Sequence, residues 1–328
     1  MVDMDERELA TVAHSYYVVG ETMEAIAKRV GVSRSTVSRM LADARERGIV
    51  RITIDTPSHD SAGLDRHLAH LGVSAHVVDV REGASPLARL DAVARTAGHL
   101  VSSLMGDGDS LGIAWGTTTT AVVDRLPAKP LRDATVVQLN GAASSWTSGI
   151  AYAGDLLTRA AAAYDAHAQH FPTPAFFDAP EAKRLLWHEA SVRRVLDMHR
   201  KLSVALFGVG SLSAELPSHV YTAHYLSPAD LAELEAENVV GDVCTVFVRE
   251  DGTYADIALN DRSSGPTPGL LRSLPRRICV VVGAAKVPAL VGVLRSRAVT
   301  DLVVDRTTAL ALVRHLEHRP PLAVRLPG

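Results

Sequence analysis

The stretch GETMEAIAKRVGVSRSTVSRMLADARERG, residues 20–48, decides the fold of the N-terminal part of this chain. It holds two runs in which apolar side chains recur every three or four positions, the spacing of an amphipathic helix. Thr22 and Ser33 stand directly before these runs, where a hydroxyl can cap a helix N-terminus. Only Gly31, Val32 and Ser33 separate the runs, and glycine accepts the left-handed backbone that ends a helix. The stretch therefore predicts two helices joined by the tight turn of a helix-turn-helix.

The last predicted helix carries a polar face that suits DNA, and a further amphipathic helix is predicted upstream over residues 5–18. An arginine can bond a guanine edge with two N–H groups, and hydroxyls can contact bases or phosphates. Residues 22–51 hold seven basic and three acidic side chains, a balance of +4 in a chain whose net charge is −3. We expect DNA contacts from Thr22, Ser33, Arg34, Ser35, Thr36, Ser38 and Arg39. The alternative is an ordinary three-helix packing unit with a solvated polar face.

Two short segments mark the end of this unit. GIVRITI, residues 48–54, alternates apolar and polar side chains and predicts one short strand, either half the wing of a winged helix or a lead into the linker. DTPSHDSAG, residues 55–63, is polar and contains Pro and Gly, which is typical of a linker. We therefore expect a DNA-binding domain over residues 1–55, a linker over 56–63 and a larger domain over 64–328.

Length and composition limit the class of protein. The 328 residues, 47% of them hydrophobic and 22% charged, can bury a sizeable core. The N-terminus is acidic and lacks the apolar core of a signal peptide, and no apolar run approaches 18 residues, which favours a cytoplasmic protein outside the membrane. Cys244 and Cys279 stand in apolar runs and are expected to be buried thiols. We expect no metal, no cofactor and no catalytic residue.

From residue 64 onward, apolar β-branched runs alternate with helical patterns. The expected strands are AHVVDV, SLGIAW, TVVQLN, SVALFGV, ICVVVG and DLVVD. The expected helices cover residues 87–105, 117–126, 152–167, 181–187, 191–200, 228–237, 287–295 and 307–315. Continuous apolar strands interleaved with helices predict an α/β fold with a parallel sheet covered on both faces. The pair Asp251-Gly252, between two strand-like runs, predicts one additional hairpin.

Polar residues gather where the predicted strands end, and ligands of open parallel sheets bind beyond the carboxyl ends of the strands. A glycine followed by four threonines opens a helix after one strand, and free N–H groups at a helix start suit a phosphate. Asn and Asp side chains suit sugar hydroxyls, whereas Lys and Arg neutralise a phosphate. We expect an effector site built from Gly116, Thr117, Thr118, Thr119, Asn140, Gly141, Asn260, Asp261, Arg262, Lys286 and Asp305. Each of these residues also has a plainer interpretation as a turn, a helix cap or a solvated side chain.

The chain resembles the SorC family of bacterial sugar-binding transcriptional regulators over nearly its whole length. The N-terminal match is YYVVGETMEAIAKRVGVSRSTVSRMLADARERGIVRITI, residues 16–54. The larger part matches, in the same order, at LGIAWGTTTTAVVDRL, VVQLNGA, FPTPAFFDAPEAKRLL, SVRRVL, VALFGVGSL, LSPADLAEL, VGDVCTVFVREDG, LNDR and LVVD. The resemblance implies a Rossmann-like effector domain related to sugar-phosphate isomerases. It also implies a sugar or phosphorylated sugar as effector and a homo-oligomer, commonly a tetramer built as a dimer of dimers.

Two positions depart from the pattern of that family. Residues 283–286 read GAAK, whereas the family usually has acidic residues before this lysine. Arg306 stands where the family usually has an acidic residue after its last aspartate, which is Asp305 here. Both departures remove negative charge near the expected site. The effector is therefore expected to be more anionic than is typical of the family.

These features together predict a regulator, and not an enzyme, whose affinity for double-stranded operator DNA is set by a bound sugar or sugar phosphate. One alternative is that the larger domain serves only oligomerisation. Another is an isomerase-like enzyme with a DNA-binding appendage. Sugar-phosphate isomerisation needs a positioned general base, for which Asp261 and Asp305 are the candidates.

Overall fold

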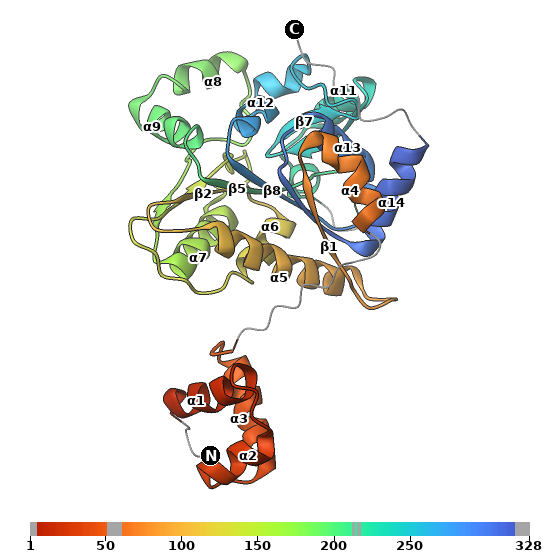
Figure 1. The fold of residues 1–328 in the computed structure, drawn as a ribbon. Coiled ribbons are helices and arrows are strands. Elements are labelled where there is room, and N and C mark those ends of the chain that lie inside the picture. Colours follow the sequence, from red (N-terminus) through yellow and green to blue (C-terminus); the bar gives the residue numbers. More distant parts are fainter. Residues whose placement is uncertain (1–4, 51–60, 212–213, 215–217, 319–328) are drawn as a thin grey trace. The chain divides into compact units, whose positions relative to one another are not determined.

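The computed structural model describes residues 5–50, 61–211, 214 and 218–318 of the chain (Figure 1). The chain divides into two compact units, residues 1–57 and residues 58–328. Residues 51–54 of the predicted strand and 56–60 of the predicted linker lie outside the described residues, and residues 48–50 form no strand. Residues 61–63, which we expected in the linker, instead open the first helix of the second unit, α4 (Ser61–Leu68).

The first unit consists of three helices, α1 (Glu6–Tyr17), α2 (Met23–Val30) and α3 (Arg34–Glu46). Thr22 caps α2 by accepting a hydrogen bond from the Ala25 amide at 3.2 Å, and Ser33 caps α3 in the same way. Gly31 follows α2 with φ +74°, the left-handed conformation that lets the chain turn within three residues. The apolar faces of the three helices form one core around Leu9, Ile26 and Val37, each fully buried.

The second unit is organised by a sheet of seven parallel strands. In spatial order these are β1 (Ser74–Val78), β9 (Asp301–Asp305), β8 (Arg276–Val281), β5 (Val204–Gly208), β2 (Ser110–Ile113), β3 (Thr135–Gln138) and β4 (His167–Gln169). The chain runs outward from β2 through β3 to β4, then returns to place β5 on the other side of β2. The order of strands therefore reverses at the gap between β2 and β5, where ligands of such sheets bind.

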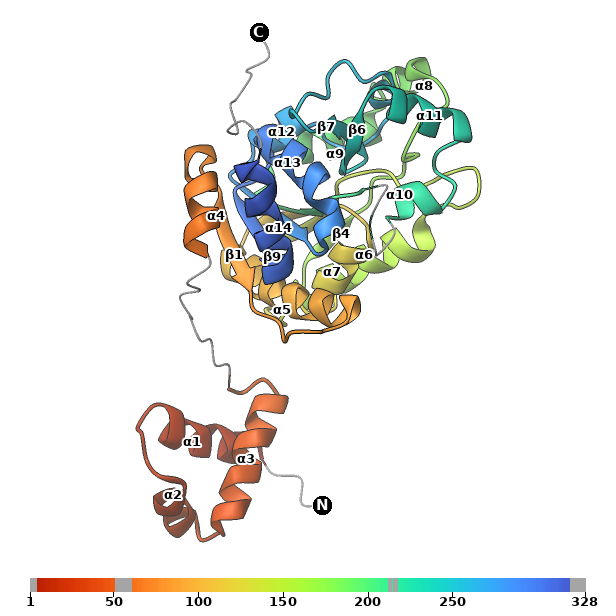
Figure 2. The ribbon, with the colours of Figure 1, turned by 90° about the vertical axis from the view of Figure 1, so that its right-hand side faces the viewer.

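Helices cover both faces of this sheet because successive strand residues point to opposite sides. Within β5, Ala205 and Phe207 pack into one apolar cluster, whereas Val204 and Leu206 pack into the other. The first cluster includes residues of α4, α9 (Ala190–His199), α12 (Pro268–Arg272), α13 (Val287–Arg295) and α14 (Arg306–Glu317). The second includes residues of α5 (Pro86–Leu104), α6 (Thr117–Val123) and α7 (Asp155–Tyr164). Figure 2 shows these two helical layers from the side.

Shorter elements connect the layers and close the carboxyl end of the sheet. They are α8 (Pro180–Leu186), α10 (His219–Thr222), α11 (Pro228–Ala236), the 3₁₀ turns η1 (Ala69–Leu71), η3 (Ala258–Asp261) and η4 (Ala284–Lys286), and the π-helical turn η2 (Ile150–Gly154).

The predicted hairpin lies one segment earlier than expected. Its strands are β6 (Val239–Val243) and β7 (Val246–Arg249), which pair antiparallel. The chain reverses at Cys244 and Thr245, with φ +50° and +68°. Neither residue is a common turn former, whereas Asp251 and Gly252 are. The prediction at Asp251-Gly252 was therefore wrong: that pair forms a turn, but the segment after it enters η3 and forms no strand.

Candidate effector cavity and nucleic-acid interface

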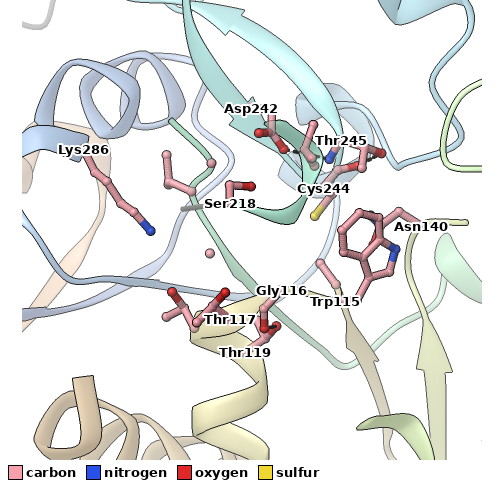
Figure 3. A pocket seen from close by; sticks show the side chains of 16 residues that line it. Trp115, Gly116, Thr117, Thr119, Asn140, Ser218, Asp242, Cys244, Thr245 and Lys286 are labelled. Atoms are coloured by element: carbon pink, nitrogen blue, oxygen red, sulfur yellow. Dashed lines mark hydrogen bonds between the residues drawn. The ribbon is translucent and has the colours of Figure 1, made fainter. Parts of the chain in front are cut away.

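A cavity with about 490 Å³ of space, including its open mouth, lies at the reversal point between β2 and β5 (Figure 3). Its walls are formed by residues 114–119, Asn140, residues 208–210, Ser218, Val220, Asp242, Cys244, Thr245 and Lys286. The segments come from β2, β3, β5, α10, the β6–β7 hairpin and η4, so the cavity exists only in the folded unit.

The start of α6 forms one side of the cavity. Gly116 precedes the helix and supplies no side-chain cap, and Thr117, Thr118 and Thr119 make up the first turn. The first amides of a helix have no acceptor within it, so they remain available to an anion. The Thr119 hydroxyl donates to the Gly116 carbonyl at 3.0 Å, which fixes the entry to the helix.

Lys286 points into the same space from η4 (Figure 3). Lys286 is only 6% exposed, which is rare for a lysine. Burial lowers the pKa of its ammonium group because the charged form loses hydration, and the nearby carboxyl group of Asp242 opposes this shift. A buried cation beside free helix amides gives the cavity two groups that attract an anion.

Asp242 lies on β6 and is 4% exposed. One carboxylate oxygen, Oδ2, accepts a hydrogen bond from the Thr245 amide at 3.1 Å, while Oδ1 has no partner among the described residues. Burial raises the pKa of Asp242 to about 6, and the Tyr221 hydroxyl, the Thr245 amide and the Lys286 charge limit the rise. The buried Tyr221 hydroxyl, which has no other hydrogen-bond partner among the described residues, lies next to this carboxylate and can donate to it.

Asn140 supplies a free acceptor after β3. The residue is 1% exposed, and its Oδ1 has no hydrogen-bond partner among the described residues. Its main chain is held in place, because the Gln138 side chain donates to the Asn140 carbonyl at 2.8 Å. Trp115 donates to the next carbonyl, that of Gly141, also at 2.8 Å. A hydroxyl group of a ligand could satisfy the free Asn140 oxygen.

The structure brings together six of the eleven expected effector residues. Those that line the cavity are Gly116, Thr117, Thr118, Thr119, Asn140 and Lys286. Gly141 lies directly behind Asn140 but does not line the cavity; a Cβ on it would stand 2.2 Å from the Pro174 carbonyl oxygen. Its glycine is thus explained by close backbone packing.

The other four expected residues lie away from this cavity, and Asn260, Arg262 and Asp305 have partners within the protein. Asn260 bonds the main chain of β7 through both ends of its amide, at 2.7 and 2.9 Å from Phe247. Arg262 pairs with Asp230 at 3.1 Å and lines a separate hollow near α8 and α11, and Asp261 at the end of η3 lines neither. Asp305 is the N-cap of α14, and its carboxylate is bonded to Thr308.

Several cavity residues were not expected from the sequence. Asp242, Cys244 and Thr245 belong to the hairpin, which lies outside the parallel sheet and so escaped a search of its strand ends. The signal that could have found them is an aspartate inside an apolar strand, at VVGDVC, since a carboxylate is seldom buried without a role. Trp115 and Ser218 gave no comparable signal.

The polar face of α3 stands open in the first unit. Arg34, Ser38 and Arg39 are exposed and make no side-chain hydrogen bond or ion pair with any residue that the structure describes. Thr22, Ser33 and Ser35 are exposed as well, and Thr36 is half-buried. The Ser33 hydroxyl lies 2.8 Å from both the Ser35 and the Thr36 hydroxyls, so the start of the helix is already organised.

Arg29 differs from the two arginines of α3. Its guanidinium pairs with Glu21 at 3.2 Å and donates to the Ser15 hydroxyl at 2.6 Å. This arginine ties α2 to α1 and its charge is largely neutralised. The local positive balance of the sequence therefore overstates the unpaired positive charge on this unit.

Within the described ranges, no three His, Cys, Asp or Glu side chains are grouped so as to hold a metal ion. In the same ranges, no helix has both the length and the apolar character that crossing a membrane requires.

Comparisons with known proteins agree with this geometry. The family described as "Putative sugar-binding domain" matches residues 69–314, and a homeodomain-like helix-turn-helix family matches residues 3–51. The deoxyribonucleoside regulator of Bacillus subtilis (strain 168) is 29% identical over 96% of this chain and 100% of its own. The sorbitol operon regulator of Klebsiella pneumoniae is 27% identical over 94% of this chain and 98% of its own.

Solved structures show the same arrangement. A domain of a possible sugar-binding transcriptional regulator from Arthrobacter aurescens TC1 superposes with a TM-score of 0.73 at 42% identity, covering 80% of this chain and all of that domain. The full-length sorbitol operon regulator SorC of K. pneumoniae superposes with a TM-score of 0.76 at 26% identity, covering 95% of this chain and 99% of its own.

Fold, cavity and polar helix together define a class: a DNA-binding transcriptional regulator with a helix-turn-helix and a sugar-binding effector domain. The chain belongs to the sugar-binding domain family and, with its helix-turn-helix, to the SorC family of transcriptional regulators.

Proposed function

We propose that the cavity binds a phosphorylated sugar and that this ligand sets the affinity of α3 for operator DNA. The observation that carries the proposal is the pair formed by Lys286 and the first turn of α6, which face one small space. A buried lysine favours an anionic ligand, because the ligand's charge replaces the stabilising interaction with water that the ammonium group lost on burial. The free oxygen of Asn140 suits a hydroxyl group of the sugar.

The names of related regulators support a carbohydrate ligand. They refer to deoxyribonucleosides, sorbitol and erythritol. The GAAK loop at residues 283–286, whose Lys286 lines the cavity, carries no acidic residue and favours a phosphorylated ligand over a neutral polyol. Arg306 lies outside the cavity and pairs with Asp79 at 3.3 Å, so this departure does not bear on the ligand. We propose that the ligand is bound and not converted: the related proteins are named as regulators, and Asp261 and Asp305, our candidates for a general base, lie outside the cavity.

In the DNA-binding unit, Arg34 and Arg39 would enter the major groove from the start of α3, with Thr22, Ser33, Ser35, Thr36 and Ser38 contacting bases or phosphates. A dimer would place two such helices at half-sites one helical turn apart, about 34 Å. The assembly we propose is a cytoplasmic homotetramer, a dimer of dimers. The ligand would act by binding one arrangement of its subunits more tightly than the other.

A thermal-shift screen of the full-length chain tests the ligand. Ribose 5-phosphate, deoxyribose 5-phosphate, fructose 6-phosphate and glucose 6-phosphate would be compared with the same sugars without phosphate, with polyols and with inorganic phosphate. A ligand present at a hundred times its Kd stabilises the native state by about 2.7 kcal/mol and so raises the Tm. We expect a phosphorylated sugar to give the largest rise.

Operator binding is measured separately, by fluorescence anisotropy on DNA that the wild-type chain selects from a random library. The stabilising sugar phosphate should change this affinity by about tenfold or more, the size of a typical coupling between sites. A Tm rise without any change in DNA affinity would contradict the regulatory role of the cavity. If no carbohydrate raises the Tm, the proposal of a sugar-phosphate effector fails, and the alternative that the larger domain serves only oligomerisation takes its place.

A further inference from the structure

Residues 263–265 lie between η3 and α12 and do not line the cavity, yet they contact two of its walls. Ser263 and Ser264 are 1% and 2% exposed, and both hydroxyls are fully used in hydrogen bonds. Two adjacent serines buried this deeply have a specific structural task, because a buried hydroxyl must be paired to be tolerated.

Ser263 holds the turn of the β6–β7 hairpin. Its hydroxyl donates to the Thr245 carbonyl at 2.8 Å and lies 3.2 Å from the Thr245 hydroxyl. Gly265 packs against the same turn so closely that a Cβ on it would stand 1.7 Å from the Cys244 carbonyl oxygen. Cys244 and Thr245 both line the cavity. This wall of the cavity is therefore held from behind.

The turn needs such a hold because its backbone is strained. Cys244 and Thr245 have φ +50° and +68°, a region that residues with a Cβ seldom adopt and β-branched residues least of all. A turn of this kind persists only where its surroundings fix it. Ser263 fixes the Thr245 carbonyl, and Asp242 accepts from the Thr245 amide at 3.1 Å.

Ser264 holds the segment that follows β3. Its hydroxyl accepts from the Gly141 amide at 2.9 Å and donates to the Ala175 carbonyl at 3.0 Å. The main-chain amide of Ser264 donates to the same carbonyl at 3.0 Å. Gly141 follows Asn140, whose side chain lines the cavity. Ser264 therefore holds the Asn140-Gly141 wall of the cavity, as its neighbour Ser263 holds the Cys244-Thr245 wall.

We propose that Ser263 and Ser264 are positioning residues of the effector cavity, which join the Cys244-Thr245 turn to the Asn140-Gly141 segment and fix the shape that the ligand meets. The inference rests on the proposed function only in taking this cavity as the effector site. The competing account is that each serine merely satisfies a buried backbone group, in which case its loss lowers stability without opening the cavity.

A matched control is available within the same unit. Ser296 is buried and its hydroxyl donates to the Val293 carbonyl at 2.7 Å, at the end of α13 and away from the cavity. Ser296→Ala removes one buried hydrogen bond to a main-chain carbonyl, whereas Ser263→Ala removes such a bond together with the longer contacts of its hydroxyl to the Thr245 hydroxyl and the Gly265 amide. If the two variants have equal Tm but different labelling rates at Cys244, the difference comes from where the serine lies and not from a general loss of stability.

Thiol labelling of the full-length chain gives a readout that needs no ligand. Cys244 is 5% exposed in the held turn, and Cys279 on β8 is fully buried and serves as the internal reference. Each variant is treated with a thiol reagent under native conditions, and modification at each cysteine is followed by peptide mass spectrometry. Opening of the turn raises the labelling rate in proportion to the open population.

We expect Ser263→Ala to label Cys244 about tenfold faster than wild type, and Ser296→Ala to stay within about twofold. Ser264→Ala should raise hydrogen exchange at residues 139–144 by a similar factor. Unchanged labelling in Ser263→Ala, or equal acceleration in Ser296→Ala, overturns the proposal. The sugar-phosphate screen stands apart from this result: if no sugar phosphate binds the wild type while Ser263→Ala still opens the turn, the proposed ligand fails and the positioning role remains.

Discussion

The two units of the chain present their functional side chains in opposite ways. In the first unit, Arg34 and Arg39 are exposed and unpaired with any described residue, on a helix that is complete by itself. In the second, Lys286 and Asp242 are 6% and 4% exposed and come from segments more than forty residues apart in the sequence. Changes at the exposed site should affect partner binding alone, whereas changes at the buried site should alter binding, stability and pH dependence together.

The largest effect is expected for Lys286→Met, which keeps the length of the side chain and removes its charge. A hydrogen bond to a charged group is worth about 1.5–3 kcal/mol, so the affinity for a phosphorylated effector should fall roughly 10- to 150-fold. Thermal-shift titration with the sugar phosphate identified for the wild type measures the loss.

Lys183→Met is the matched control for that substitution. Burial also lowers the pKa of Lys183, and its ammonium group donates to the Asn260 carbonyl at 3.3 Å, but it does not line the effector cavity. We expect its response to the ligand to match that of the wild type. An equal loss of response in both variants would show that buried lysine charge in general, and not its place in the cavity, supports binding.

Asp242→Asn should change how stability depends on pH. The pKa of Asp242 is raised from 3.8 to about 6, so between these values the folded chain holds a proton that the unfolded chain has lost. Raising the pH through this window therefore destabilises the wild type, by on the order of 3 kcal/mol in total. The Asp242→Asn variant cannot lose a proton at this position, so it does not lose this stability as the pH rises.

His199 changes the pH dependence of stability in the opposite direction to Asp242. The stability of the variant must therefore be compared with that of the wild type at each pH. Burial lowers its pKa from 6.5 to about 4, so the stability it contributes is present above pH 6.5 and is lost as the pH falls toward 4. Urea unfolding of wild type and Asp242→Asn at several pH values cancels this contribution. The stability of the variant relative to the wild type should rise between pH 4 and 6, and a constant difference would refute the assignment.

Arg39→Ala should lower operator affinity without changing the stability of the folded chain. A guanidinium bonded to a guanine edge contributes about 1–3 kcal/mol, so affinity for the selected operator should fall roughly 5- to 150-fold without a change in Tm. Arg29→Ala should show the reverse pattern, a lower Tm and a smaller loss of affinity, because Arg29 is paired with Glu21. Fluorescence anisotropy and thermal unfolding distinguish the two patterns.

The smallest effect concerns the cap of α3. Ser33→Ala removes the acceptor of the Thr36 amide and should lower the stability of the first unit by about 1 kcal/mol. Ser33→Asp keeps the cap but adds a negative charge at the end of the helix that faces DNA. Its stability should match the wild type while operator affinity falls, and equal affinity would place the start of α3 away from the DNA.

The helix-turn-helix could be predicted from the sequence almost completely, because local signals specify it. Thr22 and Ser33 cap the helices where expected, and Gly31 turns the chain where expected. The alternation of strands and helices in the larger unit was equally clear. The ends of the helix predicted over residues 152–167 were not, because a π-helical turn precedes α7 and the edge strand β4 follows it.

The cavity could be predicted only in part. Residues at the ends of β2 and β3 converge because parallel strands end on one side of a sheet. Asp242 and Thr245 belong to a hairpin whose place against the sheet depends on tertiary packing, and Cys244-Thr245 carries no turn signal in its composition. Asn260 and Asp305 have the right chemistry for a ligand, but their hydrogen bonds are used within the protein.

The division of the chain at residue 57 has a practical consequence for sensor engineering. The apolar core of the first unit consists of residues between Leu9 and Val50, and every residue that lines the cavity lies between Ala114 and Lys286. Among the described residues, those that line the cavity and those of its two supporting clusters all belong to the second unit, so joining this unit to a different DNA reader would leave them in place. A chimera of this kind would report the same metabolite at a promoter of choice.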